Sequence, residues 1–229
     1  MTNTATMLDY EAFTAPDIEA SFLDSLEKSE HGTAPYLHWF LNNCLPSRYV
    51  SAIDSLPFPP PHLHGLSGKR ELHNKTRRYF DAANQARYPV VSAFSNAFQS
   101  KTVTDKIARY FGTDIRGAYL RIEYAQDTDG FWLEPHTDLG VKLFTCLIYV
   151  SDEPGHEDLG TDIYDENKSH VARSPFAPGA AMVFVPSDVT YHGFEPRPIS
   201  GVRKSIIVNY VTNEWRAREQ LAFPNTPIE

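Results

Sequence analysis

The residues of this chain best suited to chemistry are two histidines, one aspartate and a downstream arginine. His136 and Asp138 lie two positions apart, so both side chains point to the same side if this stretch is extended. His192 would complete a set of two imidazoles and one carboxylate. Such a set leaves coordination positions open on the metal and suits non-haem Fe(II). We therefore expect His136, Asp138 and His192 to form a metal centre.

Arg203 and Ser205 form the second chemical feature. They share one face if this segment is a strand, because side chains two residues apart then point the same way. A planar guanidinium can bind a carboxylate through two parallel hydrogen bonds, and a serine hydroxyl can donate one more. The alternative is an exposed arginine in a surface salt bridge. We favour a clamp for an organic acid beside the metal.

Composition excludes several classes of protein. The chain has 229 residues, of which 41% are hydrophobic and 13% aromatic, which is enough for the core of one folded domain. Its net charge of −8 argues against a nucleic-acid partner, which would need a basic surface. The two cysteines, Cys44 and Cys146, are too few for a disulfide framework, and neither lies in a zinc-binding spacing.

The sequence contains no basic patch followed by an apolar leader, and no apolar segment long enough to span a membrane. We therefore expect a cytoplasmic protein without a membrane partner. Residues 1–33 are polar and acidic, and we expect an N-terminal extension that is partly flexible and loosely attached. Phe22, Leu23 and Leu26 have the spacing of one short amphipathic helix within it. Residues 34–229 are expected to form a single domain.

That domain begins with helical patterns and continues with short strands. Residues 35–41 favour a strand, a helix follows from Ser47, and residues 84–112 have helical spacing that Gly112 would end. Four β-rich runs come later, at residues 118–124, 142–150, 181–185 and 205–211. Helices followed by short strands predict an α+β fold whose core, about residues 115–212, is a β-sandwich or jelly roll.

Alternation along two of these runs predicts which side chains share the face of the metal site. One face of the earlier run carries Leu143, Thr145, Leu147 and Tyr149. One face of the later run carries Arg203, Ser205, Ile207 and Asn209. We expect both faces to line one cavity, with Asn209 within reach of a substrate.

In this order, the motifs resemble the superfamily of iron- and 2-oxoglutarate-dependent dioxygenases, and its prolyl-4-hydroxylase-like branch in particular. The resemblance covers roughly Tyr119 to Tyr210, and it depends on the ordered combination, since each piece alone is common. The matching features are Tyr124, His136-Thr137-Asp138, Thr145 to Tyr149, Pro178-Gly179 before Phe184, His192 and Arg203-Lys204-Ser205.

The resemblance implies a double-stranded β-helix, also called a jelly roll, with N-terminal helices packed on one sheet. It implies Fe(II) as cofactor, with 2-oxoglutarate and O2 as co-substrates. The implied metal ligands are His136, Asp138 and His192. The implied 2-oxoglutarate-binding residues are Arg203, Ser205, Tyr149, Tyr124 and Leu147. The implied reaction hydroxylates a substrate while 2-oxoglutarate loses CO2 and becomes succinate.

Substrate contacts are less determined by the sequence. The candidates are Asn209, Trp132, Tyr164 and Arg78, the last from a basic stretch at residues 62–84 that suits a polar or anionic substrate. Each candidate has a structural alternative: the aromatic residues suit packing positions, and the basic stretch suits a solvated surface loop. Tyr149 equally suits a buried core tyrosine.

Other histidines compete for the role of third ligand. His156 lies in an acidic, glycine-containing loop and is expected to face solvent, and His170 follows a turn-like Lys-Ser pair. We favour His192, because a Pro-Gly turn and a buried strand precede it and Arg203 follows it.

The expected function is hydroxylation of a small polar molecule. A hydroxylase of the prolyl type, acting on protein, is the first alternative, although the chain offers no separate peptide-binding domain. A metal-binding or sugar-binding jelly roll without turnover is the second. A zinc hydrolase also uses three protein ligands and an open position, but it has no need of Arg203 and Ser205.

Overall fold

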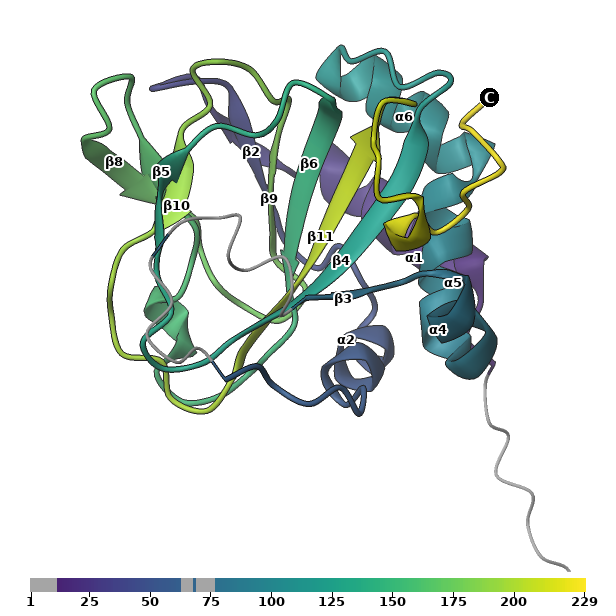
Figure 1. The fold of residues 1–229 in the computed structure, drawn as a ribbon, viewed down its shortest axis with the longest axis horizontal. Helices are drawn as coiled ribbons and strands as arrows, with labels where there is room; N and C mark the ends of the chain where they lie inside the picture. Colours follow the sequence, from purple (N-terminus) through teal and green to yellow (C-terminus); the bar gives the residue numbers. More distant parts are fainter. Residues whose placement is uncertain (1–11, 63–67, 69–76) are drawn as a thin grey trace, which may run out of the picture.

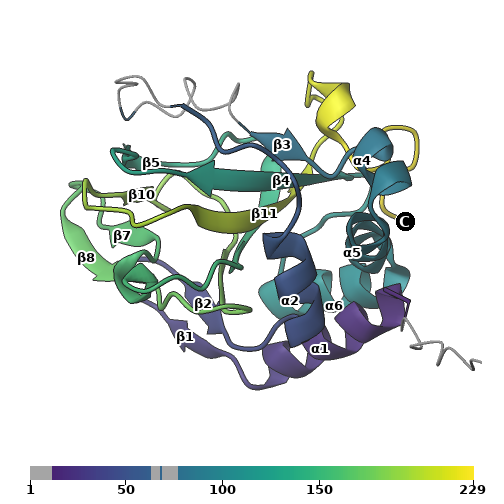
Figure 2. The same cartoon turned by 90° about the horizontal axis from the view of Figure 1, so that it is seen from below.

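Two antiparallel sheets and a layer of helices make up the fold (Figure 1). The computed structural model describes residues 12–62, 68 and 77–229. The helices and the smaller sheet lie on opposite sides of the larger sheet, as two views at right angles show (Figure 1, Figure 2). The prediction of an α+β fold is confirmed.

The helices begin and end at residues that suit these positions. They are α1 (Ala15–Glu27), α2 (Ser47–Asp54), α4 (Ala82–Arg87), α5 (Pro89–Gln99) and α6 (Lys101–Phe111), with short 3-10 turns η2 (His156–Asp158) and η3 (Arg218–Gln220). Asp81 caps α4 by accepting a bond from the Asn84 amide, and Ser100 accepts one from Val103 at the start of α6. Gly112 ends α6 in the left-handed conformation, as predicted.

Within the described part of the chain, no helix has the length and apolar character that crossing a bilayer requires.

The first four strands of the chain belong to the larger sheet, and the later strands are divided between the two sheets. The strands are β1 (Glu30–Gly32), β2 (His38–Leu41), β3 (Arg78–Tyr79), β4 (Tyr119–Asp127), β5 (Leu133–His136), β6 (Lys142–Tyr149), β7 (Asp162–Tyr164), β8 (His170–Arg173), β9 (Ala181–Phe184), β10 (His192–Phe194) and β11 (Arg203–Val211). The larger sheet has the order β1-β2-β9-β6-β11-β4-β3, and the smaller sheet has the order β5-β10-β7-β8. All pairs are antiparallel; β6 is the central strand of the larger sheet, and β11 lies between β6 and β4.

Two apolar cores follow from this layering. The first lies between the helices and the larger sheet, where Phe111 of α6 packs against Trp39 and Phe144. The second lies between the two sheets and includes Leu147 and Phe184. Alternate residues of the central strands therefore enter different cores, which is why these strands are buried on both faces.

The N-terminal segment is part of the first core, so the prediction of a loosely attached extension is wrong for its described residues. Ile18, Phe22 and Leu26 of α1 are fully buried, and the Phe22 ring lies 4.9 Å from that of Phe98 in α5. Three apolar residues on one stripe of a helix bury enough surface to hold it on the domain. The prediction for residues 1–11 lies outside the described residues.

Candidate metal and co-substrate site

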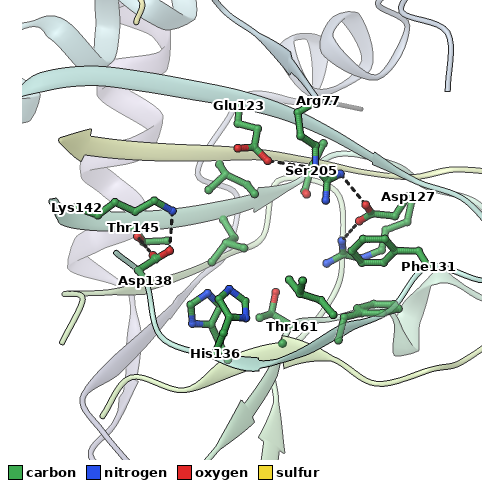
Figure 3. A pocket seen from close by; sticks show the side chains of 18 residues that line it. Arg77, Glu123, Asp127, Phe131, His136, Asp138, Lys142, Thr145, Thr161 and Ser205 are labelled. Atoms are coloured by element: carbon green, nitrogen blue, oxygen red, sulfur yellow. Dashed lines mark hydrogen bonds and ion pairs between the residues drawn. The ribbon is translucent and has the colours of Figure 1, made fainter. Parts of the chain in front are cut away.

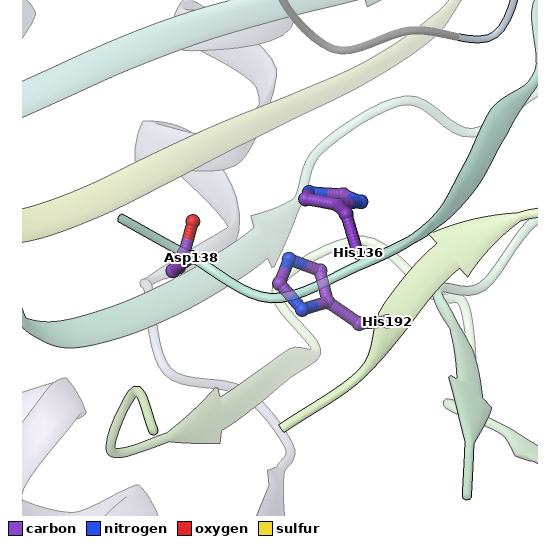
Figure 4. Close-up of side chains that lie close together, drawn as sticks. All are labelled: His136, Asp138 and His192. Atoms are coloured by element: carbon purple, nitrogen blue, oxygen red, sulfur yellow. The ribbon is translucent and has the colours of Figure 1, made fainter. Parts of the chain in front are cut away.

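The three predicted metal ligands lie together in a pocket between the two sheets (Figure 4). His136 ends β5, and its register partner on β10 is His192, so antiparallel pairing brings the two imidazoles to ring centres 4.4 Å apart. Asp138 lies two residues past the end of β5. One ligand atom of each residue lies within 4.8 Å of the other two, which is the spacing of ligands around one ion.

Gly193, next to His192, allows β5 and β10 to approach closely. A Cβ at this position would lie 2.6 Å from the backbone oxygen of Leu133, closer than real Cβ atoms come to another atom. The absence of a side chain therefore permits the pairing that places the two histidines together.

The histidine tautomers fit a metal. His136 places Nδ1 at 2.9 Å from the Glu134 carbonyl, and His192 places Nδ1 at 3.0 Å from the Thr190 carbonyl. A carbonyl oxygen can only accept, so each Nδ1 carries the proton and each Nε2 carries the lone pair that binds a metal. Two neutral imidazoles and one carboxylate are the donor set that Fe(II) uses when open positions remain.

Asp138 accepts bonds at both carboxylate oxygens. Lys142 Nζ lies 2.6 Å from Oδ1, and the Thr145 hydroxyl donates to Oδ2 at 2.6 Å (Figure 3). The side chains of Asp138 and Lys142 are both almost completely buried. A ligating carboxylate that is hydrogen-bonded in this way keeps one orientation.

A β-bulge explains why Lys142 and Thr145 reach the same carboxylate. Tyr210 pairs with Phe144, whereas its neighbour Val211 pairs with Lys142, so β6 holds one extra residue at position 143. Simple alternation predicted Leu143 on the pocket face, and this prediction is wrong. Leu143 packs against the core under the helices, and Lys142 turns into the pocket instead.

Arg203 lies at the other end of the pocket face, in a buried position that excludes the surface salt bridge. Its Nη1 donates to Asp127 Oδ2 at 2.6 Å, and its Nε donates to the Leu159 carbonyl at 2.7 Å. A guanidinium has five donors, so two bonds fix its plane without exhausting it. Ser205 and Leu147 line the same pocket.

An ion-pair network that the sequence did not predict joins Arg203 to the rest of the pocket (Figure 3). Arg77 donates from Nη1 to Asp127 Oδ1 at 2.7 Å and places Nε 3.3 Å from Glu123 Oε1. Arg121 Nη2 donates to Glu123 Oε2 at 2.7 Å. Three arginines and two carboxylates therefore alternate in one chain of contacts, and each carboxylate contacts two of the cations.

The electrostatics of this network favour the ionised form of Glu123. Burial raises the pKa of Glu123, but Arg121, Arg77 and Lys142 outweigh it and bring the pKa to about 2. Burial lowers the pKa of Arg77, and Asp127 and Glu123 raise it above the usual value for arginine. Paired charges of this kind can stay buried, because each is compensated.

The two tyrosines predicted near the co-substrate occupy different places. Tyr124 faces the helix side of β4, packs against Phe80 and donates to the Ile53 carbonyl at 3.2 Å. Because its strand neighbours on either side line the pocket, Tyr124 points away from it, and the prediction is wrong on orientation.

Tyr149 lies in the core between the sheets, with the Arg203 guanidinium 5.6 Å from the centre of its ring. Its hydroxyl donates to Thr161 Oγ1 at 2.8 Å, and Thr161 lines the pocket. It therefore matches the core-tyrosine alternative, and a direct contact with 2-oxoglutarate stays a prediction.

The four substrate candidates are not among the described residues that line the pocket. Asn209 is fully buried behind Thr145 and donates to its Oγ1 at 2.9 Å, so it supports the wall instead of facing a ligand. The Trp132 ring packs against Gly68, where a Cβ would lie 2.2 Å from a ring carbon. Tyr164 packs against His170 and is buried, and Arg78 on β3 is exposed.

The competing histidines have other partners. His156 is buried, with Nδ1 3.1 Å from Ser151 Oγ and Nε2 2.7 Å from the Ser200 carbonyl, so the prediction that it faces solvent is wrong. His170 lies near Asp162 and Glu195 in a second group with metal-like spacing. Arg173 and Arg197 both contact Asp162 at 2.6 Å, and two guanidinium groups leave this carboxylate poorly suited to a cation.

Sequence reasoning missed Arg77, Glu123, Asp127 and Lys142. For two of them a signal was present, because Glu123 and Asp127 lie on the face of β4 opposite to Ile122 and Tyr124, together with Arg121. Several charged residues on one face of a strand whose other face is apolar indicate a buried polar face. The orientation of Lys142 depends on the bulge in β6, which no local sequence pattern indicates.

Comparison with known proteins gives structural neighbours only. No family model matches the sequence, and no curated protein matches it. A prolyl 4-hydroxylase from Phytophthora capsici has a TM-score of 0.59 at 13% identity, covering 90% of this chain and 68% of that chain.

Two further neighbours are similar to a slightly lower degree. One is a prolyl hydroxylase from Trichoplax adhaerens in complex with a peptide of hypoxia inducible factor, with a TM-score of 0.55 at 14% identity, covering 89% of this chain and 93% of that chain. The other is a viral collagen prolyl hydroxylase of Paramecium Bursaria Chlorella virus-1 in a 2OG complex. Its TM-score is 0.52 at 12% identity, and the match covers 76% of this chain and 96% of that chain. At these identities the likeness shows the fold, and at that level the resemblance to the prolyl-4-hydroxylase-like branch is confirmed.

Proposed function

We propose that this protein is an Fe(II)- and 2-oxoglutarate-dependent oxygenase that hydroxylates a small polar molecule and releases succinate and CO2. We assign strands β4 to β11 to a double-stranded β-helix. Two sheets that take the strands in the orders β9-β6-β11-β4 and β5-β10-β7-β8 support this assignment, since a jelly roll has eight strands in two sheets.

The observation that carries the proposal is the convergence of two separate features in one pocket. His136, Asp138 and His192 supply a metal-binding face, and Arg203 lies in the same pocket with a guanidinium held in one plane. A three-ligand site alone would also suit a zinc hydrolase. A buried arginine at the far end of the same wall suits an enzyme whose second ligand is a dicarboxylate.

Each residue has a defined task in this proposal. The two imidazoles and Asp138 would hold Fe(II), with the imidazoles fixed by backbone carbonyls and the carboxylate by Thr145. Arg203 and Ser205 would bind the far carboxylate of 2-oxoglutarate, and Leu147 and Ile207 would keep water from its methylene groups. When bound, Fe(II) would activate O2, which is the oxidant, with 2-oxoglutarate as co-substrate, while the protein would supply position and a dry site.

A protein hydroxylase of the prolyl type is the second candidate. The observation in its favour is the neighbour from Trichoplax adhaerens, whose structure is a complex with a peptide. Charged side chains of both signs in the pocket, among them Glu123 and Lys142, suit a small polar molecule better than the ring of a prolyl residue.

The test is anaerobic addition of Fe(II) and 2-oxoglutarate, followed by visible absorption spectroscopy and then by succinate release in air. We expect a charge-transfer band in the wild type that is absent in His136→Ala and in His192→Ala. His31→Ala is the matched control, because His31 is exposed on β1, far along the sequence from the pocket strands. His156→Ala is unsuitable, because its buried ring makes two structural contacts.

Two results would contradict the proposal. A band that persists in His192→Ala would place the third ligand elsewhere. A protein that binds Zn(II) but gives neither band nor succinate would favour the hydrolase. Succinate release stimulated by proline-containing peptides and by no metabolite would instead favour the second candidate.

A further inference from the structure

Arg77 places a second guanidinium in the pocket that Arg203 lines. Both arginines contact Asp127, Arg77 at Oδ1 over 2.7 Å and Arg203 at Oδ2 over 2.6 Å. Arg77 Nε also lies 3.3 Å from Glu123 Oε1, and the Arg77 side chain is only 7% exposed. One buried carboxylate therefore holds two guanidinium groups beside each other in the pocket wall.

The register of β4 and β11 places a serine next to this pair of arginines. The two carboxylates that Arg77 contacts lie on one face of β4, on either side of Ala125. Ala125 lines the pocket with only a methyl group, which leaves room for the guanidinium. On β11 the register partner of Ala125 is Ser205, and that of Asp127 is Arg203. The three side chains therefore meet in one part of the pocket.

Each of these three side chains keeps a donor for a ligand. Among the described residues, none accepts a hydrogen bond from Nη2 of Arg77 or from Nη2 of Arg203. The Ser205 hydroxyl likewise bonds to no described residue, although Ser205 is only 1% exposed and lines the pocket. Figure 3 shows Arg77 pointing into the pocket close to Ser205. Three donors that face one space suit a carboxylate, whose two oxygens accept several bonds.

The charge of the network leads to the same ligand. Three arginines and two carboxylates form one chain of contacts, in the order Arg121, Glu123, Arg77, Asp127, Arg203. No side chain in this chain is more than 11% exposed, and one positive charge is left over. Buried charge costs free energy unless it is compensated. An added carboxylate against the two arginines on Asp127 supplies the compensation.

Asp127 explains why one arginine is insufficient for the clamp. A carboxylate 2.6 Å from the Arg203 guanidinium neutralises much of its attraction for an incoming dicarboxylate. Arg77 lies on the other oxygen of the same carboxylate and restores the positive charge. Asp127 therefore orients both guanidinium groups, and the pair together keeps a net affinity for anions.

We propose that Arg77 is the second arm of the co-substrate clamp. The far carboxylate of 2-oxoglutarate binds between the guanidinium groups of Arg77 and Arg203, and the Ser205 hydroxyl is the third donor. This inference rests on the proposed function and adds to it a residue outside the jelly-roll strands that contributes to co-substrate specificity.

The test compares two keto acids that differ only in the far group. 2-Oxopentanoate has the chain of 2-oxoglutarate with a methyl group in place of the far carboxylate, so the ratio of the two dissociation constants isolates the clamp. Calorimetric titration of the Mn(II)-loaded protein measures both constants without turnover. We expect Arg77→Gln to reduce this ratio about tenfold or more, because it weakens 2-oxoglutarate and leaves 2-oxopentanoate unchanged.

Two further variants separate contact from net charge and from general effects. Arg121→Gln removes one positive charge from the same network, but Arg121 is not among the described residues that line the pocket, so the ratio should fall much less. Arg87→Gln, at an exposed position of α4, should leave both constants unchanged. In Arg77→Gln each carboxylate of the network keeps one arginine, so we expect the variant to fold.

The outcomes distinguish this inference from the proposed function. An unchanged ratio in Arg77→Gln, or an equal fall in Arg77→Gln and Arg121→Gln, would overturn the inference alone. If Arg77→Gln does not unfold cooperatively, Arg77→Lys replaces it, and the ratio should still fall because lysine lacks the planar fork. If 2-oxopentanoate binds too weakly to measure, the 2-oxoglutarate constants of the Arg77 and Arg121 variants decide. If the wild type binds neither keto acid, the proposed function fails and this inference fails with it.

Discussion

Arg203 illustrates how one side chain can be held by the protein and still serve a ligand. Bonds to Asp127 and to the Leu159 carbonyl fix the plane of its guanidinium, and the ring of Phe194 lies 4.8 Å below its centre. Ligand binding to a guanidinium that is already fixed costs less conformational entropy than binding that must first order the side chain. Affinity for a dicarboxylate then depends on geometry as well as on charge.

This dependence leads to a prediction for Arg203→Lys. The variant keeps the positive charge but loses the planar fork, so we expect the KM for 2-oxoglutarate to rise about tenfold or more. The charge-transfer band should still form at saturating 2-oxoglutarate. Succinate release against 2-oxoglutarate concentration measures the change, and Arg116→Lys, at an exposed position, is the control. An unchanged KM would remove Arg203 from the co-substrate site.

At the scale of the element, the short strands β5 and β10 carry the histidines and depend on neighbouring structure for their position. Asp162, on β7, accepts bonds from Arg173, Arg197 and the Glu195 amide, and so connects β7 and β8 to the end of β10. Burial raises the pKa of Asp162, but these donors outweigh it and lower the pKa below its usual value. The carboxylate therefore stabilises the strand that presents His192.

We predict that Asp162→Asn lowers the free energy of unfolding by about 3 kcal/mol, because it leaves two arginines beside a neutral side chain. Chemical denaturation measures this loss. Metal affinity should fall as well, since the position of His192 depends on β10. Asp188→Asn, at an exposed turn, should change neither property, and a similar small effect of both variants would contradict the structural role of Asp162.

Helix α1 gives a second prediction at this scale. Phe22 is fully buried against Phe98, whereas Leu23 is only partly buried on the same helix. Phe22→Ala should therefore cost about 3–5 kcal/mol of stability and Leu23→Ala clearly less. Urea denaturation of both variants checks the difference. Equal, small losses would mean that α1 is attached as loosely as the polar sequence around it suggests.

At the scale of the whole molecule, the buried ion network makes stability depend on pH. The pKa of Glu123 is about 2 in the folded protein and near 4.5 when unfolded. A depressed pKa stabilises the fold fully above the unfolded value, and this contribution is lost as pH falls towards the folded value. It amounts to about 3 kcal/mol at neutral pH, at 1.36 kcal/mol per pKa unit.

We predict that the stability difference between the wild type and Glu123→Gln is largest at pH 7 and shrinks below pH 4.5, with about half remaining near pH 3. Denaturant titrations from pH 7 to pH 3 measure this difference directly. Lys28 and Asp24 form an exposed ion pair, so Asp24→Asn should show almost no such dependence and serves as the control. A difference that stays constant with pH would show that Glu123 does not titrate as its surroundings require.

The extent of correct prediction also differs with scale. The period of two in β11 placed Arg203, Ser205 and Ile207 on one face, because alternation depends only on local backbone geometry. Helix ends were predictable for the same reason, as at Gly112. The bulge that exposes Lys142 to the pocket arises from pairing with β11, which is distant in sequence, and so local patterns could not reveal it.

The errors have two sources, the resemblance and contacts between segments distant in sequence. Tyr124 was assigned to the site by resemblance, although alternation with Glu123 places it on the helix side. The network of Arg77, Glu123 and Asp127 joins segments that meet only in the folded sheet. The sequence shows which residues are charged, but which of them are buried together depends on the folded structure.

The most direct test of the central claim is a crystal structure of the protein with Mn(II) and 2-oxoglutarate, grown without oxygen. The account predicts one metal ion bound by His136, Asp138 and His192, with 2-oxoglutarate reaching from that ion to the Arg203 guanidinium. A metal bound at Asp162, His170 and Glu195, or a co-substrate carboxylate remote from Arg203, would contradict it.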